Sequence, residues 1–194
     1  MHTEIFSRKP KLSGQFFSFQ SIDKYFGIDP NQWLIEDGTV KELGADAIAL
    51  KSPRLSHNID FNCEIFDEKF DFIVAQSIFT HTGPSHFKRF LESASKALKP
   101  DGVLLFTYNG RPGDSQELPE DGWYYPQCVT YHDTSVQNMI SDTILKGKKI
   151  PWYHPASQWY AAALTKDGLP KDEHLYHLTG AVLRQEQFTD SLDK

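Results

Sequence analysis

The stretch from Phe70 to Tyr108 carries the strongest structural signal in the 194-residue sequence. Phe70–Gln76 (FDFIVAQ) and Val103–Tyr108 (VLLFTY) are apolar runs of strand length. Between them, apolar residues recur at spacings of three and four, which predicts a helix over 86–99 with one buried face and Ser85 as its cap. A strand, a helix and a strand in this order form a right-handed unit of a parallel sheet. The chain is therefore expected to have an α/β fold.

The flanking segments extend this sheet. Tyr25–Asp29 is predicted to be a strand, Gln32–Gly44 a helix and Ala45–Leu50 a short strand. The helix is expected to contact the core through four of its residues, Trp33, Leu34, Val40 and Leu43. Two aromatic-rich pieces in KKIPWYHPASQWYAAALT predict an antiparallel edge. The prediction is one mostly parallel sheet with helices on both faces, since near-continuous apolar strands need cover on each side.

The composition argues against several classes of protein. The net charge is −6 and we see no basic block, which argues against a nucleic-acid partner. No apolar run approaches the roughly 20 residues of a membrane span, and the first residues lack an apolar signal core, so a cytoplasmic protein is predicted. Two cysteines, Cys63 and Cys128, do not suggest a disulfide framework.

Ligands of open α/β sheets bind outside the carboxyl ends of the strands, so residues that follow the strands are candidate site residues. Asp29 ends the first strand, where a carboxylate is suited to accept both hydroxyls of a ribose. The alternative is an aspartate that opens the Pro30–Asn31 turn and caps the next helix. Both interpretations stay open on the sequence.

The loop QSIFTHTGP places amide, hydroxyl and imidazole groups at the end of the Phe70–Gln76 strand. His81 is the candidate general base, because imidazole titrates near neutral pH. The alternative is a histidine that packs on the following helix. No glycine-flanked serine is present, and neither cysteine has a histidine close by in sequence, so a hydrolase is not favoured.

Two further groups of residues contain side chains that could form a site. His174 and His177, with His132–Asp133, lack a third ligand at a recognisable spacing, so no metal site is predicted. The aromatic cluster of Trp152, Tyr153, Trp159 and Tyr160 is either the floor of a substrate pocket or core and sheet edge.

Over residues 13–165 the sequence resembles the class I S-adenosylmethionine-dependent methyltransferases. The stretches that carry the resemblance are YFGIDPNQWLIEDG, FDFIVAQSIFTHTGPSHFKRFLESASKALKPDGVLLFTY and, more loosely, WYHPASQWYAAAL. The resemblance implies S-adenosylmethionine as cofactor, with Asp29 on the ribose and Asp60 near the adenine. It places Gln76 and Ser77 by the methionine moiety and the methyl acceptor, an unknown small molecule.

The sequence departs from the family at the glycine-rich turn that normally follows the first strand. Gly14 is the only glycine before Gly27, so the first βα unit is expected to be missing or rebuilt. Glycine permits close backbone approach to a cofactor. The absence of the glycine-rich turn therefore leaves two interpretations. One is an active enzyme with a truncated start or a strand from a second chain. The other is a degenerate, non-catalytic relative that has lost the cofactor and binds a partner.

The predicted organisation is an N-terminal arm (1–14), a methyltransferase-like domain (15–165) and a C-terminal extension (166–194). A missing central strand leaves backbone groups of its two neighbours unpaired, which a domain of this size cannot tolerate in number. Residues 1–20 are therefore expected to add a strand to the gap, with Phe16–Phe19 as a candidate. The alternative is exchange with a second copy to form a homodimer, or closure by a partner subunit.

Overall fold

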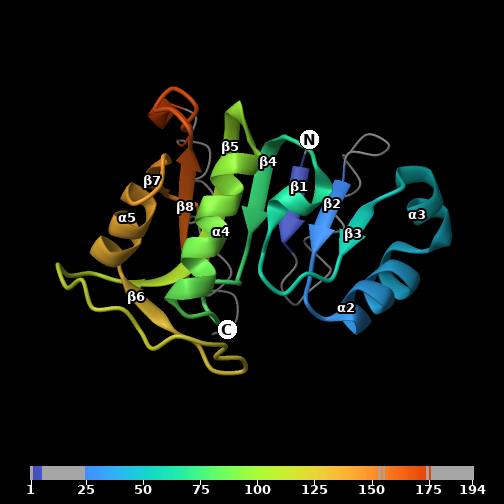
Figure 1. Ribbon diagram of the computed structural model, residues 1–194, viewed down its shortest axis with the longest axis horizontal. Helices are drawn as coiled ribbons and strands as arrows, with labels where there is room; N and C mark the ends of the chain where they lie inside the picture. Colours follow the sequence, from blue (N-terminus) through green and yellow to red (C-terminus); the bar gives the residue numbers. More distant parts are fainter. Residues whose placement is uncertain (1, 6–24, 153, 155, 174, 176–194) are drawn as a thin grey trace, which may run out of the picture.

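The computed structural model describes residues 2–5, 25–152, 154, 156–173 and 175 (Figure 1). Its strands form one mixed sheet in the order β3-β2-β1-β4-β5-β8-β7, and β6 pairs with the far end of β5. Strands β1 to β5 are parallel to their neighbours, whereas β8 runs antiparallel between β5 and β7. The predicted α/β architecture with an antiparallel edge is confirmed.

The centre of the sheet is filled from within the chain. Strand β1 (His2–Ile5) lies between β2 (Tyr25–Ile28) and β4 (Phe70–Ala75) and pairs with both. The central strand is thus supplied by the chain itself, and exchange with a second copy is not needed to close the gap. Phe16–Phe19, the segment proposed for this position, lies outside the described residues.

The predicted strand–helix–strand unit is present as β4, α4 (Pro84–Ala97) and β5 (Leu98–Arg111). Strand β5 starts earlier than expected, because LKPDG is its first part and the predicted helix ends at Ala97 instead of at residue 99. Gly102 is required there because a Cβ would lie 2.5 Å from the carbonyl oxygen of Phe70, at an irregularity in the β4–β5 pairing.

The predicted cap of α4 is wrong. The helix begins at Pro84 with Gly83 as the N-cap residue, and Ser85 lies inside the first turn. The Ser85 N–H instead donates to Asp121 Oδ1 at 3.0 Å, so a distant loop supplies the capping carboxylate. Gly83 permits this approach, since a Cβ there would lie 2.6 Å from the same carboxylate oxygen.

Residues 32–51 are helical apart from Gly44, in three pieces: α2 (Gln32–Asp37), a π-helix (Gly38–Leu43) and α3 (Ala45–Lys51). The strand expected over Ala45–Leu50 is therefore wrong. Its alternating alanines favour a helix, and Gly44 (φ 80°) only separates two helical segments. Trp33 is 61% exposed, so the expected core contact is wrong as well, and the side chains of Leu34, Val40 and Leu43 lie outside the description.

The remaining elements are β3 (Arg54–Ser56), a 3₁₀ turn (Cys63–Phe66), β6 (Thr130–His132), α5 (Asp133–Ser141), β7 (Lys146–Ile150) and β8 (Gln158–Ala163). Helices α4 and α5 lie side by side in front of the sheet in Figure 1. No helix within the described residues is long and apolar enough to span a bilayer.

Side chains alternate along β5 between two buried clusters. Leu104 and Phe106 belong to the large aromatic cluster, whereas Val103 and Leu105 pack against a smaller one with Trp159 and Leu175. Trp152 and Trp159 stack with ring centroids 4.6 Å apart, and Tyr160 stacks on Phe106 at 5.5 Å. Trp159 and Tyr160 are thus core residues, while Tyr153 lies outside the described residues.

Candidate functional site

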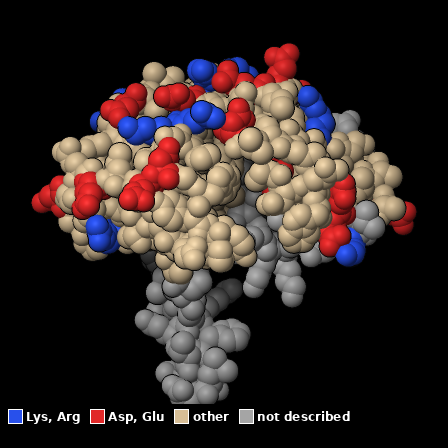
Figure 2. Space-filling model, turned by 60° about the horizontal axis from the view of Figure 1, so that its bottom comes forward, with Lys and Arg blue, Asp and Glu red and all other residues tan. Residues whose placement is uncertain are grey.

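The strand order reverses between β1 and β4. From β1 the chain continues outward to β2 and β3, then returns to β4 and β5 on the other side. Ile5 is level with Ile28 of β2 and with Ala75 of β4, so the three strands end together. In open α/β sheets such a switch point leaves a crevice at the carboxyl ends, which is where a ligand binds. Figure 2 turns this lower edge of Figure 1 forward, and most of the charged side chains visible in that view lie in its upper part and at its two sides.

Asp29 directly follows β2 at this edge and is only 2% exposed. Its Oδ1 accepts a hydrogen bond from the Asn31 N–H at 2.7 Å, and its own N–H donates to the Ser56 carbonyl at 3.1 Å. Burial raises the pKa of the carboxyl group, and the Asn31 hydrogen bonds counteract the shift only in part. The turn-opening contact is therefore present, and Asp29 also directly follows β2, the strand next to β1.

Gln76 and Ser77 directly follow β4. Ser77 has a left-handed backbone (φ 58°), which is uncommon for a residue other than glycine. Its N–H donates to the hydroxyl of buried Thr107 on β5 at 2.7 Å. This contact fixes the bend of the chain away from the sheet at the crevice.

Asp60 lies in the loop after β3, with its Oδ1 accepting from the Asn62 N–H at 3.2 Å. Phe61 is also left-handed (φ 56°) and is fully buried, with Trp123 at 5.5 Å between ring centroids. Asn58 Oδ1, in the same loop, is buried and has no hydrogen-bond partner among the described residues. The loop therefore offers a desolvated acceptor beside a rigid aromatic anchor.

His81 follows β4 on a loop that is bound to a second loop. Its Nδ1 lies 2.7 Å from the carbonyl oxygen of Gln127. Because a carbonyl only accepts, Nδ1 carries the proton in this arrangement and Nε2 keeps its lone pair. Cys128 Sγ lies 3.9 Å from the same nitrogen. The sequence did not reveal this Cys–His proximity, because the two residues are 47 positions apart.

Backbone hydrogen bonds hold these two loops together. The Tyr124 N–H donates to the His81 carbonyl and the Val129 N–H to the Thr80 carbonyl, both at 2.8 Å. The Tyr131 hydroxyl donates to the Thr82 carbonyl at 2.7 Å. His81 is consequently held by a pair of hydrogen-bonded loops and not by a free loop.

A second polar network lies at the end of β5 and was not identified from the sequence. The Tyr108 hydroxyl donates to Asp133 Oδ1 at 2.8 Å, and Lys149 of β7 forms an ion pair with the other carboxylate oxygen. Burial raises the pKa of Tyr108, and the hydrogen bond to Asp133 adds to the shift. The network joins β5, α5 and β7, which indicates a structural role.

Other groups contribute no chemistry that can be assigned. Among the residues that the structure describes, no three His, Cys, Asp or Glu side chains gather as metal ligands, and His174 and His177 lie outside that set. Cys63 is fully buried, and this burial raises the pKa of its thiol to about 12.

The predicted site residues all follow the carboxyl ends of strands: Asp29 after β2, Asp60 after β3, and Gln76, Ser77 and His81 after β4. Their roles remain predictions. Thr107, Asn58 and Cys128 join them only in the structure, because each is placed by a contact or by burial that sequence spacing does not encode.

Comparison with known proteins gives a consistent result. Residues 17–106 match the family model described as a methyltransferase domain. No curated protein sequence matches the chain.

Several solved structures share the fold. An S-adenosylmethionine-dependent methyltransferase from Clostridium acetobutylicum ATCC 824 is 15% identical, with a TM-score of 0.61 over 84% of this chain and 83% of its own. The glycopeptide N-methyltransferase MtfA is 11% identical, with a TM-score of 0.62 over 84% of this chain and 83% of its own. The DhpI–SAM–HEP complex is 15% identical, with a TM-score of 0.61 over 83% of this chain and 77% of that chain.

Proposed function

The chain has the class I S-adenosylmethionine-dependent methyltransferase fold, and the resemblance of its sequence to that family is confirmed; from this premise we propose that it transfers a methyl group from S-adenosylmethionine to a small molecule. The observation that carries the proposal is a buried acid, Asp29, at the end of β2 beside the switch point that β1 completes.

The residues at the crevice fit the cofactor. A buried carboxylate that follows β2 suits the two hydroxyl donors of a ribose. Asn58 Oδ1 is a buried acceptor that lacks a partner among the described residues, and an adenine amino group is a donor of the kind it needs. When bound, S-adenosylmethionine supplies a methyl group already activated by the sulfonium.

The protein's task is then to align and desolvate the reactants. Asp29 would bind the ribose, Asp60 and Asn58 would lie by the adenine, and Gln76 and Ser77 would line the methionine end. His81 would accept the proton of the acceptor at Nε2, while its Nδ1–H stays bonded to the Gln127 carbonyl.

A calorimetric titration with S-adenosylhomocysteine tests the cofactor site. We expect binding by the wild type and a loss of roughly tenfold or more in Asp29→Ala, since hydrogen bonds to charged groups contribute about 1.5–3 kcal/mol. Asp142→Ala is the matched control, because Asp142 is an exposed aspartate just after α5. A wild type that gives no heat, with no change in Asp29→Ala, would refute the cofactor site.

The tautomer of His81 can be tested without knowing the acceptor. Nitrogen-15 NMR at a pH above the titration of histidine should show a protonated Nδ1 and a bare Nε2. His81→Asn retains a donor near the Nδ1 position and removes Nε2, so it should leave S-adenosylhomocysteine affinity unchanged. A proton on Nε2 in the wild type would contradict the proposed base.

The second candidate is a non-catalytic relative that keeps the fold to bind a partner. Its support is the sequence after β1, FSRKPKLSG, which lacks the glycine-rich turn of the family. Failure of both S-adenosylhomocysteine and S-adenosylmethionine to bind the wild type would favour this candidate.

A further inference from the structure

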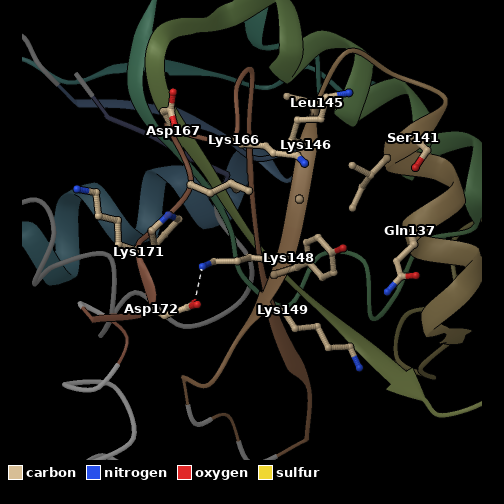
Figure 3. Close-up of a pocket in the computed structure, with 15 residues that line it drawn as sticks. Gln137, Ser141, Leu145, Lys146, Lys148, Lys149, Lys166, Asp167, Lys171 and Asp172 are labelled. Carbon is tan, nitrogen blue, oxygen red and sulfur yellow. Dashed lines mark hydrogen bonds and ion pairs between the residues drawn. The ribbon is translucent and has the colours of Figure 1, made fainter.

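A pocket of about 1220 Å³ lies along the outer edge of β7, away from the switch point. One wall is α5 and the other is the segment 166–172 that follows β8 (Figure 3). β7 is the last strand of the described sheet order, so it has no strand neighbour on this side among the described residues. Lys146, where β7 begins, is level with Ala163, where β8 ends, so this end of the pocket lies at the edge of the sheet opposite the crevice.

Five lysines line this pocket, which is unusual in a chain with a net charge of −6. Lys146, Lys148 and Lys149 come from β7, and Lys166 and Lys171 from the neighbouring segment. They are close together only in the folded protein, because 16 residues of hairpin separate Lys149 from Lys166.

Two of these lysines are neutralised from opposite sides of β7. Lys148 pairs with Asp172 at 2.8 Å, and Lys149 pairs with Asp133 of α5. For Lys146, Lys166 and Lys171 the structure gives no ion pair within the part of the chain that it describes. Elsewhere both situations occur: Lys41 pairs with Asp37 and Lys99 with Asp71, whereas Lys88 of α4 has no ion pair among the described residues.

Lysines on an edge strand have a structural explanation, since they prevent pairing with another sheet. That explanation applies to Lys146, Lys148 and Lys149, which belong to β7. It does not apply to Lys166 and Lys171, which lie outside the strand and line the same pocket. Lys146, Lys166 and Lys171 thus bring three positive charges to the lining of one concavity, and an anion bound in it would be attracted by all three.

The shape of the pocket and the charges that line it favour one kind of anion over another. Lysine binds phosphate as a point charge, and edge-strand N–H groups offer further donors. Asp167 and Asp172 stand within the same lining, which disfavours a long polyanion laid across the surface but leaves room for a compact one. We propose that this pocket is a second ligand site, which binds a small anion carrying two or more phosphate groups through Lys146, Lys166 and Lys171.

Inorganic triphosphate is the probe, because it lacks adenosine and does not report on the crevice. Calorimetry and phosphorus-31 NMR at low ionic strength should detect binding, with affinity falling as salt is added. Lys166→Ala with Lys171→Ala should weaken binding by roughly fivefold for each lysine removed, by the size of an exposed charge contact. The control, Lys88→Ala with Arg89→Ala, removes two exposed cations of α4 and should have little effect.

A gain of affinity provides a test that misfolding cannot mimic. Asp172→Asn removes an acid from the lining and frees Lys148, so triphosphate should bind several-fold more tightly. Absence of triphosphate binding by the wild type, or equal loss in the α4 control, would overturn the proposal. So would a single-stranded RNA that displaces triphosphate and binds more tightly through the same lysines, since the ligand would then be an extended polyanion.

Discussion

The two halves of the sheet, a deep one and a shallow one, differ in the length of their strands and in how many helix side chains they bury. In one half, β5 spans 14 residues between β4 and β8, and α4 buries seven side chains, among them Phe87, Phe90 and Leu91. In the other, β1 and β2 have four residues each and β3 has three. None of the seven residues that the structure describes in α3 is buried, and Trp33 of α2 is 61% exposed.

This difference suits the two halves to different roles in the proposed site. The deep half holds His81 and Thr107 on a rigid aromatic core, which suits a group that must stay in place. The shallow half holds Asp29 and Asp60, the residues proposed for the cofactor. Regions that bind ligands are drawn from the less stable parts of proteins. We therefore expect the β1–β3 half to open more readily and to be stabilised when a ligand binds.

The largest effect is expected in the deep half. Phe87 is fully buried and stacks on Phe79 at 4.1 Å between ring centroids. Phe87→Ala should lower the free energy of unfolding by about 3–5 kcal/mol, since it leaves a cavity among aromatic side chains. Trp33→Ala in the shallow half should change it by about 0.5 kcal/mol or less. Chemical denaturation measures both, and similar values for the two variants would contradict the comparison.

The second effect concerns the central strand. Glu4→Pro removes a backbone N–H from β1, which pairs on both sides, and should cost about 3 kcal/mol. Glu4→Ala keeps the N–H and is the matched control. Hydrogen exchange should show that β2 amides lose more protection than β5 amides. Equal loss in both strands would mean that the halves unfold as one unit.

The same contrast explains what the sequence could predict. The β4–α4–β5 unit is long, periodic and buried, so its pattern identifies it without knowledge of the rest. The tetrapeptide HTEI of β1 has no pattern of its own and becomes a strand because its two neighbours need a partner. Residues 45–50 were predicted as a strand because a short apolar run does not distinguish strand from helix.

The positions of the candidate site residues in the fold were predictable to a similar extent, while their roles stay predictions. Asp29, Gln76 and Ser77 follow from the rule that ligands lie at strand ends. The left-handed backbone of Ser77 and its bond to Thr107 do not, because 30 residues separate the partners. The pocket lysines were also missed, since KGKK is short and its companions follow the β8 strand.

A third effect concerns Asp29 and the pH. The pKa of Asp29 is raised in the folded state by burial, so its contribution to stability is full below the unfolded pKa and is lost as the pH rises through the folded pKa. Asp29→Asn keeps an acceptor for the Asn31 N–H and does not titrate. The variant should therefore gain in Tm over the wild type as the pH rises above the ordinary aspartate pKa of 3.8. A difference in Tm that does not change with pH would contradict the desolvated carboxylate.

The smallest effect concerns the cap that joins the two loops of the deep half. Asp121 is fully exposed, and its hydrogen bonds to Ser85 lower the pKa of its carboxyl group. A lowered pKa stabilises the fold above the unfolded value and ceases to do so as the pH falls through the folded value. Asp121→Ala should thus lower Tm slightly at pH 7, and the two melting curves should converge in acid. Asp114→Ala, in the same loop and exposed, is the control and should match the wild type throughout. If Asp121→Ala also matched the wild type at pH 7, Gly83 and the backbone bonds of Tyr124 and Val129 would hold the loops without the carboxylate.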